Sequence, residues 1–230
     1  MSTWAIIPAR GGSRRIKHKN LKKIAGEPLV GIAAMQAIKS ERIDNIIINT
    51  NDNEIRKVAE SYDVRVSSRP QQYTQEDTMM VVDQFLTWQV KTLKEQGHEV
   101  DTVTLLYPTS PLRTIDDIDD TIALVNEKNY DSSLTLSEDT SYLWEVQDGQ
   151  ASPINYDPKQ RGPGQLEDWN QWVENKAVYC FDSELLLSTG CRLGGKIGFV
   201  EMEPLRSVDI DTPDDLELAK KIVEIDGKSW

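Results

Sequence analysis

The 230-residue sequence is poor in cysteine, histidine and long apolar runs, and each scarcity excludes a class of protein. Its two cysteines, Cys180 and Cys191, are too few for a disulfide framework or a cysteine-rich metal site, so we expect reduced thiols. Its two histidines, His18 and His98, lie far apart without a partner pattern, and no Ser/His/Asp triad is predicted. No apolar stretch reaches the length of a membrane span, and no signal peptide is recognisable. We therefore expect a cytoplasmic protein with no membrane partner.

Positive charge is also in deficit, because 26 lysines and arginines face 38 aspartates and glutamates, for a formal net charge of −12. Nucleic acid usually requires a basic face, so we expect no nucleic-acid partner. The hydrophobic fraction of 38% is modest, but apolar segments are interspersed with charged ones, which argues against disorder. The length suits one domain, and we expect residues 1–230 to form it.

Short apolar runs alternate with helical patterns along the chain. The strand-like runs lie at residues 4–9, 44–50, 64–67, 102–107, 131–137, 176–182 and 195–202. Helical spacing and end signals predict helices at 28–40, 51–63, 76–96, 115–128 and 212–225. This order predicts an α/β fold, in which a mostly parallel sheet carries helices on both faces. In such folds the ligand binds beyond the carboxyl ends of the strands.

Residues 138–175 differ in character from the rest of the chain. They are polar and aromatic, include Trp144, Trp169 and Trp172, and contain the turn-rich NYDPKQRGPGQ. This stretch is too long for an ordinary connection. We expect an insertion that serves as a lid or as an arm contacting a second subunit. A local cap over the sheet edge is the alternative.

A basic loop follows the first predicted strand, where the fold would place a ligand. Residues 10–23 hold seven of the 26 lysines and arginines. Gly11 and Gly12 allow a tight turn that presents backbone N–H groups to an anion, and Arg10, Arg14 and Lys19 could neutralise that anion. A triphosphate fits these donors better than a single carboxylate. The spacing matches neither the P-loop nor the dinucleotide fingerprint, and a solvated basic loop is the alternative.

The stretch IIPARGGSRRIKHKN (6–20) resembles the nucleotide-binding signature xxPARGGSKGIPxKN of cytidylyltransferases that activate acidic sugars. Further matches follow in order: GEPLV (26–30), NTNDNEI (49–55), SRP (68–70), LLYPTSPLR (105–113), ENKAVY (174–179) and SVDIDTPDDL (207–216). The resemblance covers residues 4–225 and is closest to the CMP-N-acetylneuraminic acid synthetase family, with its relatives for other nonulosonic acids.

The resemblance implies a Rossmann-like nucleotidyltransferase fold and an enzyme. The implied reaction transfers CMP from CTP to the anomeric hydroxyl of an acidic 2-keto sugar and releases pyrophosphate. The implied cofactor is Mg²⁺ or another divalent cation, and the implied partners are CTP, the acidic sugar and a second copy of the chain, into which the insertion crosses. The alternatives are a Kdo-like acid, an amino-sugar acid or a phosphonate as acceptor, or a non-catalytic nucleotide- or sugar-binding relative.

The resemblance also implies a nucleotide site. Arg10, Arg14 and Lys19 would contact the phosphates, and these three with Asp211 are the expected catalytic residues. Arg69 would help to hold the cytidine, although taken alone it fits a surface arginine before a turn. The implied nucleotide-binding set is Ala9, Arg10, Gly11, Gly12, Ser13, Arg14, Lys19, Asn20, Arg69 and Asp77.

The segment SVDIDTPDDL suggests a metal site. Asp209 and Asp211 alternate with apolar residues, so on an extended backbone both carboxylates point the same way. Two carboxylates on one side suit Mg²⁺, which keeps waters and bridges to substrate phosphate, and the resemblance favours this role. The alternative is that Asp211 caps the helix beginning near Thr212. We expect Asp214 and Asp215 only to favour the dipole of that helix.

The implied sugar contacts come from LLYPTSPLR, the insertion and ENKAVY. Thr109, Ser110 and Arg113 could either bind the sugar or fix their loop. The full set is Tyr107, Thr109, Ser110, Arg113, Arg161 and Asn175.

The sequence departs from the family pattern at both sites. Tyr107 replaces a glutamine usual in sialic acid enzymes, so the sugar's substituents could differ. Val173 and Lys176 replace an arginine and a glycine, so Arg161 or Lys176 would have to compensate for lost carboxylate contacts. In the basic loop, Arg14, Arg15 and Lys17 replace lysine, glycine and proline, which retains charge but changes its geometry.

Overall fold

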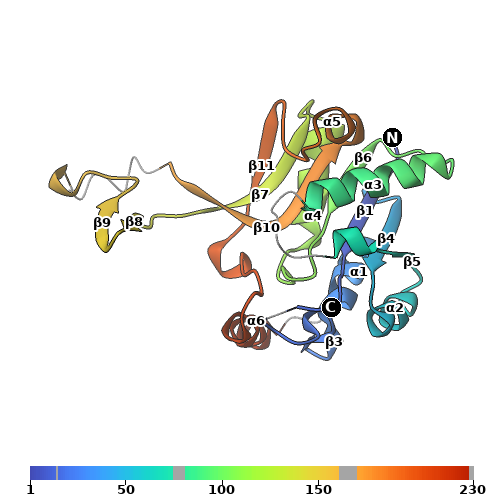
Figure 1. Ribbon diagram of the computed structural model, residues 1–230, viewed down its shortest axis with the longest axis horizontal. Helices are drawn as coiled ribbons and strands as arrows, with labels where there is room; N and C mark the ends of the chain where they lie inside the picture. Colours follow the sequence, from blue (N-terminus) through green and yellow to red (C-terminus); the bar gives the residue numbers. More distant parts are fainter. Residues whose placement is uncertain (14, 75–80, 161–169, 228–230) are drawn as a thin grey trace.

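The computed structural model describes residues 1–13, 15–74, 81–160 and 170–227. Its main strands are β1 (Thr3–Pro8), β4 (Asn45–Thr50), β5 (Arg65–Ser68), β6 (Thr102–Leu105), β7 (Ser132–Glu138), β10 (Trp172–Asp182) and β11 (Ile197–Glu201). They form one sheet in the order β11-β7-β10-β6-β1-β4-β5 (Figure 1). Neighbouring strands are parallel except for β10, which is antiparallel to both β6 and β7. The predicted, mostly parallel sheet is confirmed.

Helices cover both faces of this sheet, as the sequence predicts. One face carries α1 (Leu29–Lys39), α2 (Asn53–Glu60) and α4 (Ile115–Asn126), and the other carries α3 (Val81–Glu95) and α5 (Ser183–Thr189). The central strand β1 must therefore be apolar on both sides. Ala5 and Ile7 pack toward the first group of helices, whereas Trp4 and Ile6 pack toward the second, and all four are buried.

A third apolar cluster joins the two ends of the chain. The last helix, α6 (Pro213–Asp226), contributes Leu216, Ala219 and Val223 to this cluster. Ile16 of the basic loop and Ile24 belong to the same cluster. Ile24 ends the short strand β2 (Lys23–Ile24), which pairs with β3 (Glu27–Pro28). The cluster therefore fixes the C-terminal helix beside the first loop.

The insertion is shorter than the predicted 138–175, because β7 and β10 both continue into it. Trp172 of β10 pairs with Glu138 of β7, so the excursion is confined to residues 139–171. Its strands β8 (Trp144–Gln147) and β9 (Gln150–Pro153) form a hairpin that stands well away from the sheet (Figure 1). The alternative of a local cap over the sheet edge is therefore wrong. Trp169 lies outside the described residues.

Every predicted strand and helix has a counterpart, with shifted ends. The strand expected at 102–107 ends at Leu105, and residues 76–80 of the helix expected at 76–96 lie outside the described residues. Helix α5 was not predicted. It begins after Asp182, whose carboxylate accepts hydrogen bonds from the N–H groups of Glu184 and Leu185. Both cysteines are unpaired. Within the described ranges, no helix combines the length and apolarity that crossing a bilayer requires.

We expect Thr212→Ala to lower the free energy of unfolding by about 1 kcal/mol. Thr212 Oγ1 accepts a hydrogen bond from the N–H of Asp215, whose carboxylate accepts one from the N–H of Thr212, which completes a capping box at the start of α6. Urea unfolding followed by circular dichroism measures the loss. Thr212→Ser keeps the hydroxyl and is the matched control, so equal stability of the Ala variant and the wild type would contradict the cap.

Candidate functional site

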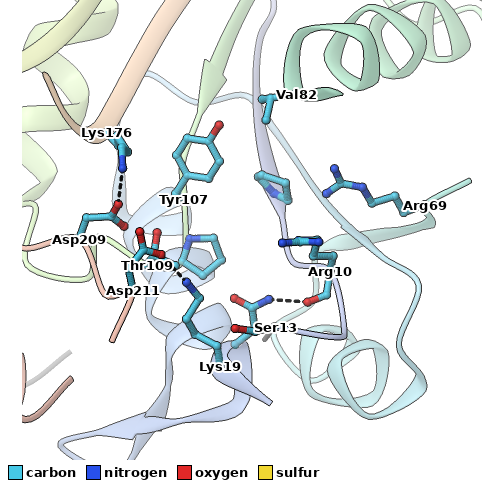
Figure 2. A pocket seen from close by; sticks show the side chains of 13 residues that line it. Arg10, Ser13, Lys19, Arg69, Val82, Tyr107, Thr109, Lys176, Asp209 and Asp211 are labelled. Atoms are coloured by element: carbon cyan, nitrogen blue, oxygen red, sulfur yellow. Dashed lines mark hydrogen bonds and ion pairs between the residues drawn. The ribbon is translucent and has the colours of Figure 1, made fainter. Parts of the chain in front are cut away.

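A pocket of about 280 Å³ opens at the carboxyl ends of β1 and β6 (Figure 2). This is where the fold predicts a ligand. Ten residues singled out by the sequence line it: Arg10, Ser13, Lys19, Asn20, Arg69, Tyr107, Thr109, Lys176, Asp209 and Asp211. Pro8, Val82 and Pro108 complete the lining.

The basic loop owes its path to its two glycines. A Cβ at Gly11 would lie 2.8 Å from the Asp52 carboxylate, so only glycine can approach the start of α2 this closely. Gly12 has a φ of +82°, which is strained for any residue with a side chain. The N–H of Gly11 donates to Asn51 Oδ1 at 2.9 Å, and Asn20 Nδ2 donates to the carbonyl of Arg10 at 2.8 Å. The turn is therefore held from both sides.

Arg69 is not a surface arginine. Only 9% of it is exposed, its Nε donates to the carbonyl of Tyr73 at 2.8 Å, and its guanidinium lies 4.3 Å from the centre of the Phe85 ring. Burial, and then the charge of neighbouring Arg10, lower its pKa to about 10, so it remains charged at neutral pH. Two arginines on one pocket wall create a strong preference for an anion.

Asp209 and Asp211 line the pocket, as their alternation predicts. Val208 and Ile210 point instead into the third apolar cluster. The N–H of Ile210 donates to the carbonyl of Thr109 at 2.8 Å, which fixes this segment against the loop after β6. The sequence alternative of an Asp211 helix cap is wrong, because Thr212 occupies the cap position.

Each aspartate is paired with a lysine (Figure 2). Asp211 is 2.9 Å from Lys19 Nζ, and Asp209 is 2.8 Å from Lys176 Nζ. Partial burial disfavours the Asp211 carboxylate, but the hydrogen bond and charge of Lys19, with the charges of Lys176 and Arg15, outweigh it and lower its pKa. The hydrogen bond to Asp209 raises the pKa of Lys176. Asp211 is therefore ionised, and both carboxylates of this acidic wall, Asp209 and Asp211, have an ammonium partner.

The two aspartates could supply only part of the ligand set of a metal ion. In the parts of the chain that the structure describes, no three His, Cys, Asp or Glu side chains gather closely enough to hold an ion by themselves. Two carboxylates fit a hard cation that takes its remaining ligands from water and from substrate phosphate. The donor set suits an ion that arrives with a nucleotide.

An aromatic wall closes the pocket beside Asp209. The Tyr107 ring packs edge-on against Tyr179 at 6.2 Å, and the Arg192 guanidinium lies 4.6 Å from the centre of the Tyr179 ring. Arg192 is held by Asp83 at 2.6 Å. Burial is the main cause that raises the pKa of Tyr107 to about 12, so its hydroxyl is neutral. No sequence motif contains Asp83, Arg192 or the lining residue Val82, so none of the three was predicted.

Several residues expected to touch ligands are buried in the scaffold instead. Arg113 is fully buried, and its Nη1 donates to the carbonyls of Tyr107, Ser110 and Ala177. Burial lowers the pKa of Arg113 to about 9. Ser110 is also buried. Of the two sequence alternatives for Ser110 and Arg113, the structure supports fixing the loop.

Asn175 also lies outside the pocket lining and is 5% exposed. Its Oδ1 accepts hydrogen bonds from Thr135 Oγ1 and the N–H of Ala177, and its Nδ2 donates to Ser207 Oγ. A direct sugar contact by Asn175 is therefore not available in this arrangement.

The predicted residues Arg14, Asp77 and Arg161 lie outside the described residues. Ala9 is buried, and it donates its N–H to the carbonyl of Asn49.

Comparison with known families matches residues 4–226 to the cytidylyltransferase family. The chain belongs to this family. The resemblance inferred from the sequence motifs is thus confirmed, and so is the nucleotidyltransferase fold, because the chain superimposes on solved structures of that kind. One is CMP:2-keto-3-deoxy-manno-octonic acid synthetase complexed with CTP, with a TM-score of 0.70 and 14% identity over 98% of this chain and 100% of that one.

Similar proteins include N-acylneuraminate cytidylyltransferase A of Danio rerio, 32% identical over 95% of this chain and 50% of the fish protein. The CMP-N,N'-diacetyllegionaminic acid synthase of Legionella pneumophila is 26% identical over 100% of this chain and 99% of its own length. The chain therefore spans about half the length of the vertebrate relatives that it matches, and nearly all of the Legionella one.

We expect Asn175→Ala to lower the free energy of unfolding by about 2–3 kcal/mol, because it leaves buried donors without acceptors. Ser207→Ala, which removes one partner of Asn175, should cost about 1 kcal/mol. Thermal and urea unfolding of both variants without ligand test this ranking. An Asn175→Ala variant as stable as the wild type would point back to a ligand-binding role for the side chain.

Proposed function

We propose that this chain transfers CMP from CTP to the anomeric hydroxyl of an acidic 2-keto sugar of the nonulosonate class and releases pyrophosphate. The observation that carries the proposal is one pocket in which Arg10, Lys19 and Arg69 face Asp209 and Asp211. A polyanion and a hard cation are the ligands that such a combination favours. The family and the named activities of the similar proteins support the choice of CTP and an acidic sugar.

The basic loop receives the triphosphate in this proposal. The turn at Gly11 and Gly12 lets phosphate approach the backbone closely, and Arg10 and Lys19 supply positive charge. Lys19 Nζ also donates to the carbonyl of Ile210, so Lys19 links the basic loop to the segment that carries Asp209 and Asp211. Positioning and charge stabilisation then do most of the catalysis, as is usual in phosphoryl-type transfers.

Asp209 and Asp211 would hold the Mg²⁺ ion. When bound, it would neutralise charge on the α-phosphate and on the departing pyrophosphate. The acceptor lies toward Tyr107 and Thr109, so that its anomeric oxygen can reach the α-phosphorus. A bond forms between these two atoms, the bond from the α-phosphorus to the oxygen bridging to the β-phosphate breaks, pyrophosphate leaves, and the hydroxyl proton passes to solvent.

We expect the protein to release pyrophosphate from CTP with Mg²⁺ and one of four acids: N-acetylneuraminic, N,N'-diacetyllegionaminic, pseudaminic or 2-keto-3-deoxy-manno-octonic acid. Asp211→Asn should lower turnover by roughly 100-fold or more, because a ligand of the cation is lost. Mass spectrometry of the CMP-linked product and a pyrophosphate assay provide the measurements, and chelation of divalent cations should stop the wild-type reaction.

The matched control is Asp214→Asn, because Asp214 is exposed on the first turn of α6 and does not line the pocket. Its turnover should equal that of the wild type. Unchanged activity of Asp211→Asn would remove the cation role, and CTP binding without turnover of any acid would favour a non-catalytic relative. Preference for 2-keto-3-deoxy-manno-octonic acid would show that the acceptor is a Kdo-like acid and not a nonulosonic acid of the sialic type.

We also propose that the projecting hairpin contacts a second copy of the chain. Its exposed apolar side chains include Trp144, Val146 and Ile154, which are 47%, 72% and 60% exposed. The rings of Tyr142 and Tyr156 pack edge to face at 4.5 Å and order the base of the hairpin. An ordered apolar arm that touches little of its own domain is typical of a subunit contact.

Val146→Asp should therefore shift the protein from dimer to monomer in sedimentation analysis, since it places a charge in the contact. Gln147→Asp introduces the same charge at the next position, on the opposite face of the hairpin, and serves as the control. A wild-type protein that is already monomeric at micromolar concentration would contradict the arm's proposed role.

A further inference from the structure

Lys176 lies across the pocket from Arg10 and Arg69 (Figure 2). Its side chain is 52% exposed, and its Nζ donates to Asp209 Oδ2 at 2.8 Å. A lysine ammonium has three N–H donors, and this bond uses one of them. The group therefore has capacity for a second anionic partner inside the pocket.

The backbone at Lys176 is strained. Its φ is +60°, a conformation that glycine adopts freely and that a side chain disfavours. The residue lies in an irregularity of β10, where the register with β7 shifts between Glu174 and Tyr179. Bulges of this kind often redirect a side chain beside an active site, and strain at such a place points to a functional side chain.

The other basic side chains of the pocket lining come from elements that the proposed function assigns to the nucleotide. Arg10 and Lys19 come from the basic loop, and Arg69 follows β5. Lys176 comes from β10 instead and lies near Asp209, on the side of the pocket that Tyr107 closes. A sugar acid that enters beside Tyr107 would bring its carboxylate toward this ammonium, and a hydrogen bond between two such charged groups is stronger than one between neutral groups.

We propose that Lys176 binds the carboxylate of the acceptor sugar. This inference rests on the proposed function and identifies the residue that makes the enzyme require an acid. In the free protein the Asp209 carboxylate already lies within hydrogen-bond distance of Nζ, so the ammonium is placed to hold such a group. The acceptor carboxylate takes a second donor of the same ammonium.

The test compares the wild type with Lys176→Met and Lys176→Arg. The substrates are the acid that the wild type turns over fastest and the C1 methyl ester of that acid. Lys176→Met should lower kcat/KM for the acid roughly 10- to 100-fold, the usual range for a hydrogen bond between charged groups. It should change kcat/KM for the ester less than about twofold, and the KM for CTP should stay constant. Lys176→Arg should restore most of the loss.

The control is Lys220→Met, because Lys220 pairs with Glu217 on the surface of α6, away from the pocket. An equal loss of kcat/KM for the acid and for the ester in Lys176→Met would overturn the proposal. The role of Lys176 would then be limited to neutralising Asp209. Lys176→Gln gives the same comparison if the Met variant does not fold. Failure of the wild type to turn over any acid would instead contradict the proposed function.

Discussion

Lys19 and Asp211 are 192 positions apart in the sequence, yet their charged groups lie 2.9 Å from each other. A pair that is partly exposed to water contributes little free energy, so this contact does not by itself hold the fold together. The third apolar cluster supplies the stabilisation by packing Ile16, Ile210 and Leu216 together. The ion pair then links the charged ends of Lys19 and Asp211 at the pocket. Burial positions the two segments, and alternation along the chain turns Asp209 and Asp211 toward the pocket.

Buried polar side chains outside the pocket lining connect the segments that form the pocket. Arg113 joins the loop after β6 to β10 through carbonyl oxygens on both. Asn175 joins β10 to β7 through Thr135 and to the turn before the aspartates through Ser207. Asn175 has partners for both its amide oxygen and its amide nitrogen, and a buried polar side chain satisfied in this way specifies one arrangement more strictly than apolar packing does. A pocket that must orient a polyanion benefits from such rigidity, because misplacement by even 1 Å is costly to catalysis.

The sequence predicted the sheet and most of the charged lining of the pocket because both depend on local patterns. Alternation at Asp209 and Asp211 determines which side each residue faces, and the glycine pair marks the turn. The roles of Arg113 and Asn175 were harder to predict, because a ligand contact and a buried scaffold bond require the same kinds of side chain. Asp83 and Arg192 were missed since their contact joins elements far apart in sequence. No pattern among neighbouring residues in the sequence indicates such a contact.

Pro8, at the end of β1, and Asp211, just before α6, both line the pocket. Its walls are therefore formed by segments that are far apart in the sequence. During synthesis, β1, β4, β5 and β6 can associate while the ribosome is still adding the later strands. Asp209 and Asp211, however, emerge only after β11, the last strand of the sheet to be made. A nascent chain can therefore acquire a folded centre before it acquires a complete pocket, and ligand can stabilise it only once synthesis has passed Asp211.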